Sequence, residues 1–136
     1  MRTARNEPAA PISRAQMGGA GLRAFQGIAR EWALTPKEQL ALLAVPETTY
    51  RRWKTAALEG KDVPLDPGTF ERLGYILGIY KSLHILLPQN PAQWIRNPNS
   101  NPIFGGKPAL NRMMAGNVAD LFVVRQYLDA WRGGWA

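Results

Sequence analysis

Hydroxyl and basic side chains are concentrated in residues 47–60, ETTYRRWKTAALEG. If this segment is a helix, Tyr50 and Trp53 lie on one side of it and anchor it on a core, so the polar side chains project outward. Hydroxyl and guanidinium groups near the start of a helix can reach base edges in DNA, and basic groups further along can pair with phosphates. The candidates for DNA binding are Thr48, Thr49, Arg51, Arg52 and Lys54. An ordinary helical hairpin with a solvated basic face has the same composition, so this pattern alone leaves both interpretations open.

Side chains suited to catalysis or to binding a metal ion are scarce. The chain has no cysteine, which excludes disulfides and thiolate chemistry, and its single histidine, His84, excludes a His-rich metal cage. His84 lies in an apolar stretch without a placed acid or nucleophile, so we expect a core or interface histidine. Asp66, next to Pro67, is better explained as a helix cap than as an acid. We therefore predict no catalytic residue, no metal site, no cofactor and no enzymatic activity.

The basic segment is the second of two short helices. In TPKEQLALLA, Thr35, Pro36 and Glu38 form a capping box with proline at the first helical position. A turn of only a few residues then leads into the second helix, which predicts a helix-turn-helix. The formal net charge of +7 favours an acidic partner such as a nucleic-acid backbone, although Glu47 at the start of the second helix repels phosphate.

Elsewhere the apolar spacing is helical, and no segment has a strand pattern. Residues 1–20 contain too few large aliphatic side chains to offset their ordering entropy, which predicts a flexible arm, and helical spacing begins at Gly21. Residues 67–87 are apolar on nearly every side, which predicts a central buried helix. Shorter helices are expected at 108–115 and from Asn117 onward. The expected fold is one compact all-α unit, with a flexible arm at 1–20, a helix-turn-helix region at 21–61 and a further helical region at 62–136.

No segment has the features of a membrane span or a signal sequence. The most apolar window, residues 73–87, contains Lys81 and His84. It is also shorter than the roughly 20 residues that a membrane helix needs. The first residues are polar and contain arginine, without a continuous apolar stretch. We therefore expect a cytoplasmic protein that does not insert into a membrane.

Residues 94–108, WIRNPNSNPIFGGKP, have the composition of a loop pinned to a core. Its tryptophan, isoleucines and phenylalanine would anchor it, its prolines restrict the backbone, and its asparagines can bond to nearby backbone groups. Such a loop is either a packing device or a binding surface. The C-terminal end, WRGGWA, favours a binding surface, because Trp135 follows a helix-ending Gly-Gly with no obvious core to reach. Trp and Arg are also common interface anchors.

Longer stretches of the chain resemble a known family. LALLAVPETTYRRWK looks like the Xre-type helix-turn-helix of the Xre/MbcA/ParS-type antitoxins, which belong to type II toxin–antitoxin modules. The C-terminal part is similar to their toxin-binding domain. The matching features are Trp94 before an Asn/Pro loop, NPIFGGKPAL, Met113-Met114 with Gly116, VRQYLDA, and a terminal Arg-Gly-Gly-Trp. The resemblance covers about residues 21 to 136, and its C-terminal pattern is the more specific part.

The resemblance implies an all-α antitoxin without activity of its own that binds and neutralises a toxin, commonly one whose RES domain destroys NAD. It also implies a homodimer within a hetero-oligomeric complex, repression of its own operon by binding operator DNA, and a C-terminal region at the entrance of the toxin's active site. Carried over by position, the expected toxin contacts are Arg125, Arg132, Gly133, Gly134, Trp135 and Ala136, with Asn97, Asn99 and Phe104 shaping the surface.

Pro46 departs from the family pattern, because many relatives have a serine or a similar cap at the start of the second helix. Proline is tolerated in a first turn, but it lacks the capping hydroxyl, which is also a potential phosphate contact. This departure counts against DNA binding and not against toxin binding. The same residues allow an alternative hypothesis, a stand-alone helix-turn-helix transcriptional regulator without a toxin.

Overall fold

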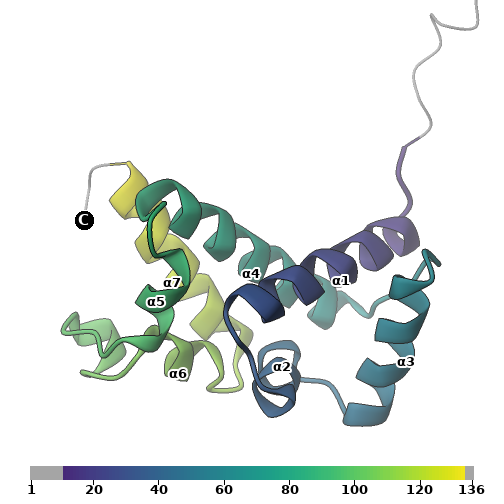
Figure 1. The fold of residues 1–136 in the computed structure, drawn as a ribbon, viewed down its shortest axis with the longest axis horizontal. Helices are drawn as coiled ribbons and strands as arrows, with labels where there is room; N and C mark the ends of the chain where they lie inside the picture. Colours follow the sequence, from purple (N-terminus) through teal and green to yellow (C-terminus); the bar gives the residue numbers. More distant parts are fainter. Residues whose placement is uncertain (1–10, 134–136) are drawn as a thin grey trace, which may run out of the picture.

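A computed structural model describes residues 11–133 of the chain, and α-helices dominate this part (Figure 1). The elements are α1 (Arg14–Glu31), α2 (Pro36–Leu43), α3 (Glu47–Leu58), α4 (Pro67–Leu86), α5 (Pro91–Arg96), η2 (Pro102–Phe104), α6 (Ala109–Met113) and α7 (Val118–Arg132). Helix α4 packs most extensively against α7, and it also contacts α1 and α2. In Figure 1, α1 to α3 lie toward one end of the molecule and α5 to α7 toward the other. The predicted all-α fold is confirmed, since the only β pairing within residues 11–133 is an isolated bridge between Pro98 and Pro108.

Helix α1 begins at Arg14, and not at Gly21, so the prediction of an arm extending to residue 20 is wrong for residues 14–20. A capping box at Ser13 starts the helix. The Gln16 amide donates to Ser13 Oγ at 3.1 Å, and the Ser13 amide donates to Gln16 Oε1 at 2.8 Å. These bonds satisfy amide groups that the first turn of a helix leaves without partners.

Two glycines explain how the start of α1 is packed without large apolar side chains. Gly18 and Gly19 are buried, and a Cβ atom on either one would overlap a backbone carbonyl oxygen, that of Val63 or of Lys61. The close approach is fixed by a hydrogen bond from the Val63 amide to the carbonyl of Ala15, 2.9 Å long. The contact uses backbone atoms, so a search for apolar spacing does not detect it.

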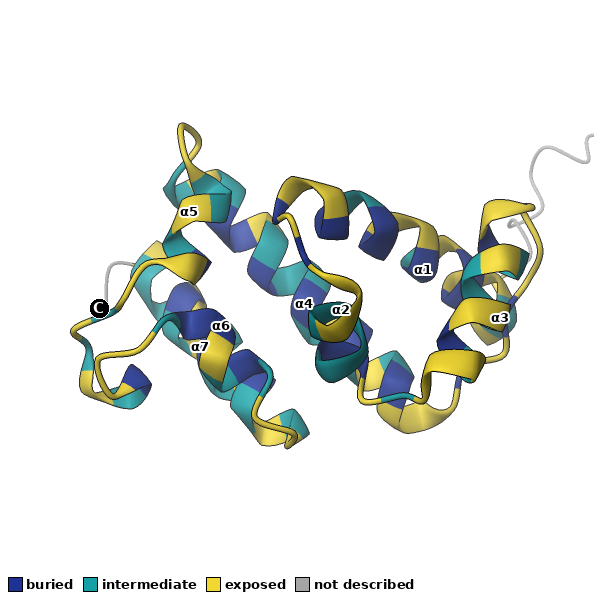
Figure 2. Cartoon of the chain, turned by 60° about the horizontal axis from the view of Figure 1, so that its bottom comes forward, coloured by how far each residue is buried: buried dark blue, intermediate teal, exposed yellow. Residues whose placement is uncertain are grey.

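One hydrophobic core joins the two ends of the molecule through α4. Its largest fully buried side chains are Leu22, Phe25, Trp32, Leu42, Leu43, Ile76, Ile79, Leu83, Ile95, Met113, Leu121 and Leu128. The predicted central helix is confirmed, because α4 contains many buried residues (Figure 2) and packs against both α1 and α7. As predicted, Asp66 caps this helix, accepting from the Thr69 amide at 3.0 Å. None of the helices within residues 11–133 combines the length and the apolar composition needed to cross a bilayer.

Candidate functional site

Tyr50 fixes α3 against the two helices that precede it. Its ring meets Phe25 of α1 edge-on, with the ring centroids 6.2 Å apart. Its hydroxyl donates to Gln39 Oε1 of α2 at 2.8 Å and accepts from Gln26 Nε2 of α1. Burial raises the pKa of the Tyr50 phenol, which keeps the proton that the bond to Gln39 requires. Because three helices meet at this ring, α3 has a fixed direction and presents its other side to solvent.

The turn between α2 and α3 has the compact form predicted from the sequence. Ala44 ends α2 in the left-handed conformation, with φ 55° and ψ 48°, and its amide donates to the Leu40 carbonyl at 2.7 Å. Pro46 precedes the first residue of α3 and provides no side-chain cap, as its lack of a hydroxyl predicts. Thr35 and Glu38 form the predicted capping box at the start of α2.

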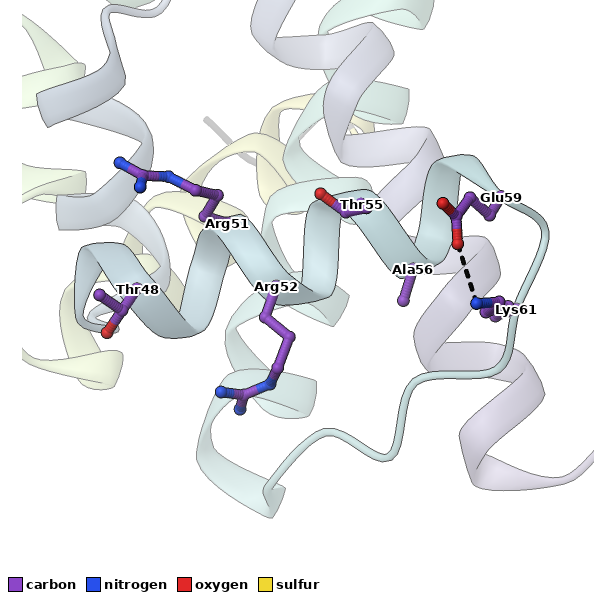
Figure 3. Close-up of a pocket in the computed structure, with 7 residues that line it drawn as sticks. All are labelled: Thr48, Arg51, Arg52, Thr55, Ala56, Glu59 and Lys61. Atoms are coloured by element: carbon purple, nitrogen blue, oxygen red, sulfur yellow. Dashed lines mark ion pairs between the residues drawn. The ribbon is translucent and has the colours of Figure 1, made fainter.

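The outer side of α3 carries a shallow hollow lined mainly by polar side chains (Figure 3). The hollow is lined by Thr48, Arg51, Arg52, Thr55, Ala56, Glu59 and Lys61. Figure 3 shows the side chains of Arg51 and Arg52 extending from the helix in different directions. Arg51 forms an ion pair with Glu47 at 3.4 Å, but its side chain is 72% exposed, so the pair adds little stability and leaves the guanidinium accessible.

The structure brings together only part of the predicted DNA-binding set. Thr48, Arg51 and Arg52 are exposed and share the hollow on α3. Lys54 is half-buried and lies on the side of α3 that faces Pro36 and Leu40 of α2. Thr49 is also half-buried and does not line the hollow. Thr55 and Lys61, which the sequence analysis did not select, lie on the same surface as the two arginines.

At the other end of the molecule, the segment 97–108 is closed by backbone contacts near its two ends. Pro98 and Pro108 form the isolated bridge, and the Asn99 amide donates to the carbonyl of Lys107 at 3.2 Å. Gly105 and Gly106 both have positive φ, 61° and 79°, which gives the chain a tight turn between the two ends of the segment.

Asparagine side chains support this segment from within, as predicted. The side-chain oxygen of Asn99 accepts from the Asn101 amide at 3.0 Å, and that of Asn101 accepts from the Ile103 amide at 3.1 Å. Asn97 is exposed at the end of α5. Arg112 of α6 then fixes the segment from outside, donating to the Ile103 carbonyl at 2.7 Å and to Asp120 Oδ1 at 3.1 Å.

Aromatic rings connect the segment to the end of α7. Trp94 stacks nearly parallel to Tyr127, with an interplanar angle of 15°, and lies 6.5 Å from Trp131 between ring centroids. Phe104 packs edge-on against both Trp94 and Tyr127. Phe104 is only 5% exposed, so it shapes this cluster from beneath, whereas the other three rings are half-buried. We call Trp94, Phe104, Tyr127 and Trp131 the aromatic cluster.

The two arginines predicted to contact a toxin lie on α7 and lean partly against α4. Arg125 covers Gly78, where a Cβ atom would collide with the guanidinium, and forms an ion pair with Asp129 at 3.3 Å. Arg132 donates to Ser82 Oγ at 3.3 Å. Their side chains remain 38% and 36% exposed. Gly133 ends the described part of the chain and is exposed. The predicted contacts Gly134, Trp135 and Ala136 lie outside the described residues.

Two arginines of this region have roles that were not predicted from the sequence. Arg112 binds the Ile103 carbonyl within the segment 97–108, and Arg96, which precedes the segment, binds the Trp32 carbonyl at the end of α1. No spacing rule selects an arginine for either task. His84, for which a core or interface position was expected, is half-buried: its side chain is 36% exposed, and its Nε2 lies 3.2 Å from Glu31 Oε2. An interface role for it stays a prediction. Within residues 11–133, no group of three or more His, Cys, Asp or Glu side chains is placed to hold a metal ion.

The fold and these two surfaces define a helix-turn-helix protein with a second helical region that presents an aromatic surface. Residues 11–78 match the antitoxin Xre-like helix-turn-helix domain, and residues 82–134 match the antitoxin Xre/MbcA/ParS C-terminal toxin-binding domain. A protein of Sinorhizobium fredii (strain NBRC 101917 / NGR234), named uncharacterized protein y4oB, is 45% identical over 118 residues, which cover 85% of this chain and 86% of the relative. The chain belongs to the Xre/MbcA/ParS-type antitoxins.

Membership in this family makes a toxin the partner of the C-terminal region. Both matched domains are binding or regulatory domains and not enzymes. The first match begins at residue 11, close to the start of α1, and extends through the first half of α4. The two matched regions therefore meet within α4, and the division predicted between residues 61 and 62 stays a prediction.

Proposed function

We propose that this antitoxin neutralises a RES-domain toxin that degrades NAD, by placing the end of α7 and the residues after it over the entrance of the toxin's active site. The observation that carries the proposal is the aromatic cluster. It lies in the region matched to the toxin-binding domain and leaves Trp94, Tyr127 and Trp131 half-exposed. The resemblance of the 94–135 motifs to antitoxins of RES toxins supports the identity of the partner.

The chemistry of this surface suits a tight protein interface. Trp, Tyr and Arg are the residues that most often dominate binding energy, and here Arg132 follows directly after Trp131. The aromatic rings already pack on one another, so binding would cost little side-chain entropy. Asn97 and Asn99 shape the edge of this surface, and Arg125 lies on the same helix as Trp131.

The test is co-expression of this chain with the product of the neighbouring gene, with a tag on only one of them, followed by an assay of NAD loss. A complex that stops NAD loss supports the proposal. A chain lacking residues 132–136 should still fold. It should protect NAD poorly, because it lacks the end that occludes the active site. Arg30→Ala, an exposed position on α1, serves as the control and should protect fully. If the truncated chain protects as well as the full chain, the occlusion mechanism is wrong.

A substitution within α7 separates direct contact from general damage to the helix. Trp131→Ala should weaken the complex by about 30-fold or more, as expected for an aromatic anchor. Phe122→Ala is the matched control, because Phe122 is an exposed aromatic residue on the same helix, 44% exposed. At about 100° per residue it lies on nearly the opposite side from Trp131. Equal losses from both substitutions would contradict a toxin interface at the aromatic cluster.

We also propose that α3 binds operator DNA and that the antitoxin represses its own operon as a homodimer. The exposed Arg51, Arg52 and Thr48 support this, as does the net charge of +7. A single recognition helix contacts few base pairs, and two copies related by a two-fold axis would read two half-sites. Binding to a symmetric DNA site at dimer stoichiometry, checked by light scattering, tests the homodimer.

The DNA contacts are tested with Arg51→Ala plus Arg52→Ala. The double variant should bind the promoter about 100-fold more weakly, because each arginine supplies a phosphate or base contact, and it should show a shallower salt dependence. Lys37→Ala on α2 is the control, since Lys37 is exposed and does not line the hollow on α3. Unchanged, sequence-specific binding by the double variant would exclude α3 as the recognition helix. Such binding without any toxin complex would favour a stand-alone regulator.

A further inference from the structure

Arg96 belongs to the toxin-binding region, but its side chain binds the helix-turn-helix region. It is the last residue of α5 and directly precedes the segment 97–108. Its Nε donates to the Trp32 carbonyl at 3.0 Å, and its Nη2 donates to the Ala33 carbonyl at 2.9 Å. The two terminal guanidinium nitrogens also bind Glu38, with Nη2 2.8 Å from Oε1 and Nη1 3.4 Å from Oε2. These partners lie 58 to 64 residues away in the chain.

The groups that Arg96 binds determine how α1 turns into α2. Trp32 and Ala33 follow the last turn of α1, where carbonyl groups lack partners within the helix and carry partial negative charge. The Glu38 carboxylate completes the cap of α2, because it accepts from the Thr35 amide at 2.9 Å. One guanidinium therefore joins the end of α1, the first turn of α2 and the start of the segment 97–108.

Only an arginine fits this position. The planar guanidinium offers several N–H groups in a fixed fork, so it can bind two carbonyls and a carboxylate at once. The Arg96 side chain is 38% exposed, so solvent screens part of the charge attraction to Glu38. The bonds to the Trp32 and Ala33 carbonyls depend less on charge. A lysine would keep the charge and lose the geometry.

We propose that Arg96 is a positioning residue that couples the placement of α2, the first helix of the helix-turn-helix, to the segment 97–108. A toxin held on that segment therefore changes the mobility of α2, and binding of DNA and toxin become linked. This second part rests on the proposed function. Coupling between two binding sites is reciprocal in free energy, so toxin and DNA would change each other's affinity by the same factor.

The first test uses the free full-length chain and amide hydrogen exchange. In Arg96→Gln, amides of α2 and of residues 97–104 should both exchange about tenfold faster, because charged hydrogen bonds from one group to both segments are lost. Arg96→Lys should not restore slow exchange in α2. Lys37→Gln is the control. It removes a positive charge next to Glu38, in the first turn of α2, and should leave amide exchange unchanged. The positioning role is wrong if Arg96→Gln speeds exchange only in residues 97–104. It is also wrong if exchange in α4 and α7 speeds up by the same factor as in α2.

The second test adds the toxin. In the natural chain the complex should slow exchange in α2 by about fivefold or more, and in Arg96→Gln it should not. A complex that forms and leaves α2 unchanged in the natural chain overturns the coupling. If no complex forms, the proposed function has failed, and the free-chain comparison still decides whether Arg96 positions α2.

Discussion

The turn between α2 and α3 and the helix caps beside it are formed by contacts between close neighbours in the chain, whereas the region around residues 94–113 depends more on side chains from separate elements. In the first, the Thr35 hydroxyl accepts a hydrogen bond from the Glu38 amide. The Ala44 amide donates to the Leu40 carbonyl, and Glu47 forms an ion pair with Arg51. In the second, Trp94, Phe104 and Tyr127 pack from three separate elements, and the surrounding arginines bind backbone carbonyls.

This difference predicts how substitutions on each surface affect stability and binding. The candidate DNA surface consists of exposed side chains on a helix that forms without them, so its residues can change with little loss of stability. The candidate toxin surface includes the rings and arginines that hold its backbone in place. Substitutions there should therefore reduce both stability and toxin binding.

Phe104→Ala should lower the free energy of unfolding by about 3–5 kcal/mol, as large-to-small substitutions of buried phenylalanine do. Phe104 is 5% exposed and supports both Trp94 and Tyr127. Urea denaturation followed by tryptophan fluorescence measures the loss. Leu58→Ala at the end of α3 is the control from the other region, because Leu58 is 60% exposed and should change stability by less than about 0.5 kcal/mol. Similar losses at the two positions would remove the contrast between the regions.

Arg112→Met should cost about 2 kcal/mol, because the Ile103 carbonyl loses its donor and Asp120 loses its partner in a partly buried site. The matched substitution on the candidate DNA surface is Arg52→Met, where the side chain is exposed and little change is expected. Thermal unfolding of both variants compares the two arginines directly. If Arg52→Met is as damaging as Arg112→Met, then α3 is not independent of its exposed side chains.

The same contrast explains what could be predicted from the sequence. Caps, turns and helical spacing act over a few residues, so α2, α3, α4 and the Asn99–Asn101 bonds followed from local patterns. The early start of α1 combines a local signal that was missed, the Ser13–Gln16 capping box, with a distant contact, because Gly18 and Gly19 are buried against a backbone that lies far along the chain.

The candidate site follows the same rule. The exposed Arg51 and Arg52 were selected correctly as outward-facing, because helical spacing alone decides that. Lys54, predicted to face outward, is half-buried and borders α2, because it lies one turn after the buried Tyr50 on the same side of α3. The roles of Arg96 and Arg112 depend on carbonyl groups that the sequence does not place.

Acid should destabilise the fold through two carboxylates that have lowered pKa values. The hydrogen bond from Arg96 lowers the pKa of Glu38, and hydrogen bonds from Thr69 lower that of Asp66. When the folded-state pKa is below the unfolded one, the stabilisation is complete above the unfolded pKa and is lost as the pH falls through the folded value. Stability should therefore fall below about pH 4 to 4.5, where the unfolded carboxyls begin to bind protons.

Urea midpoints measured from about pH 6 down to about pH 3 test this dependence. Glu38→Gln and Asp66→Asn should each flatten the decline, because neither replacement titrates. Asn also remains a good N-cap for α4. Glu38 joins the two regions through Arg96, whereas Asp66 caps its own helix, so the first variant should also loosen residues 97–104 and the second should not. An unchanged pH profile in both variants would contradict this account.

The smallest expected effect tests the local order of the α2–α3 turn. Ala44 has a positive φ of 55°, where its Cβ atom is strained and glycine is not. Ala44→Gly should therefore stabilise the protein by about 0.5–1 kcal/mol, after the greater freedom of glycine in the unfolded chain is subtracted. Ala24→Gly, at an exposed position inside α1, should instead destabilise by about 1 kcal/mol. Opposite signs in thermal unfolding would show that this turn is set by its own backbone. A loss at both positions would mean that the placement of α2 by distant contacts, including Arg96, outweighs the local turn.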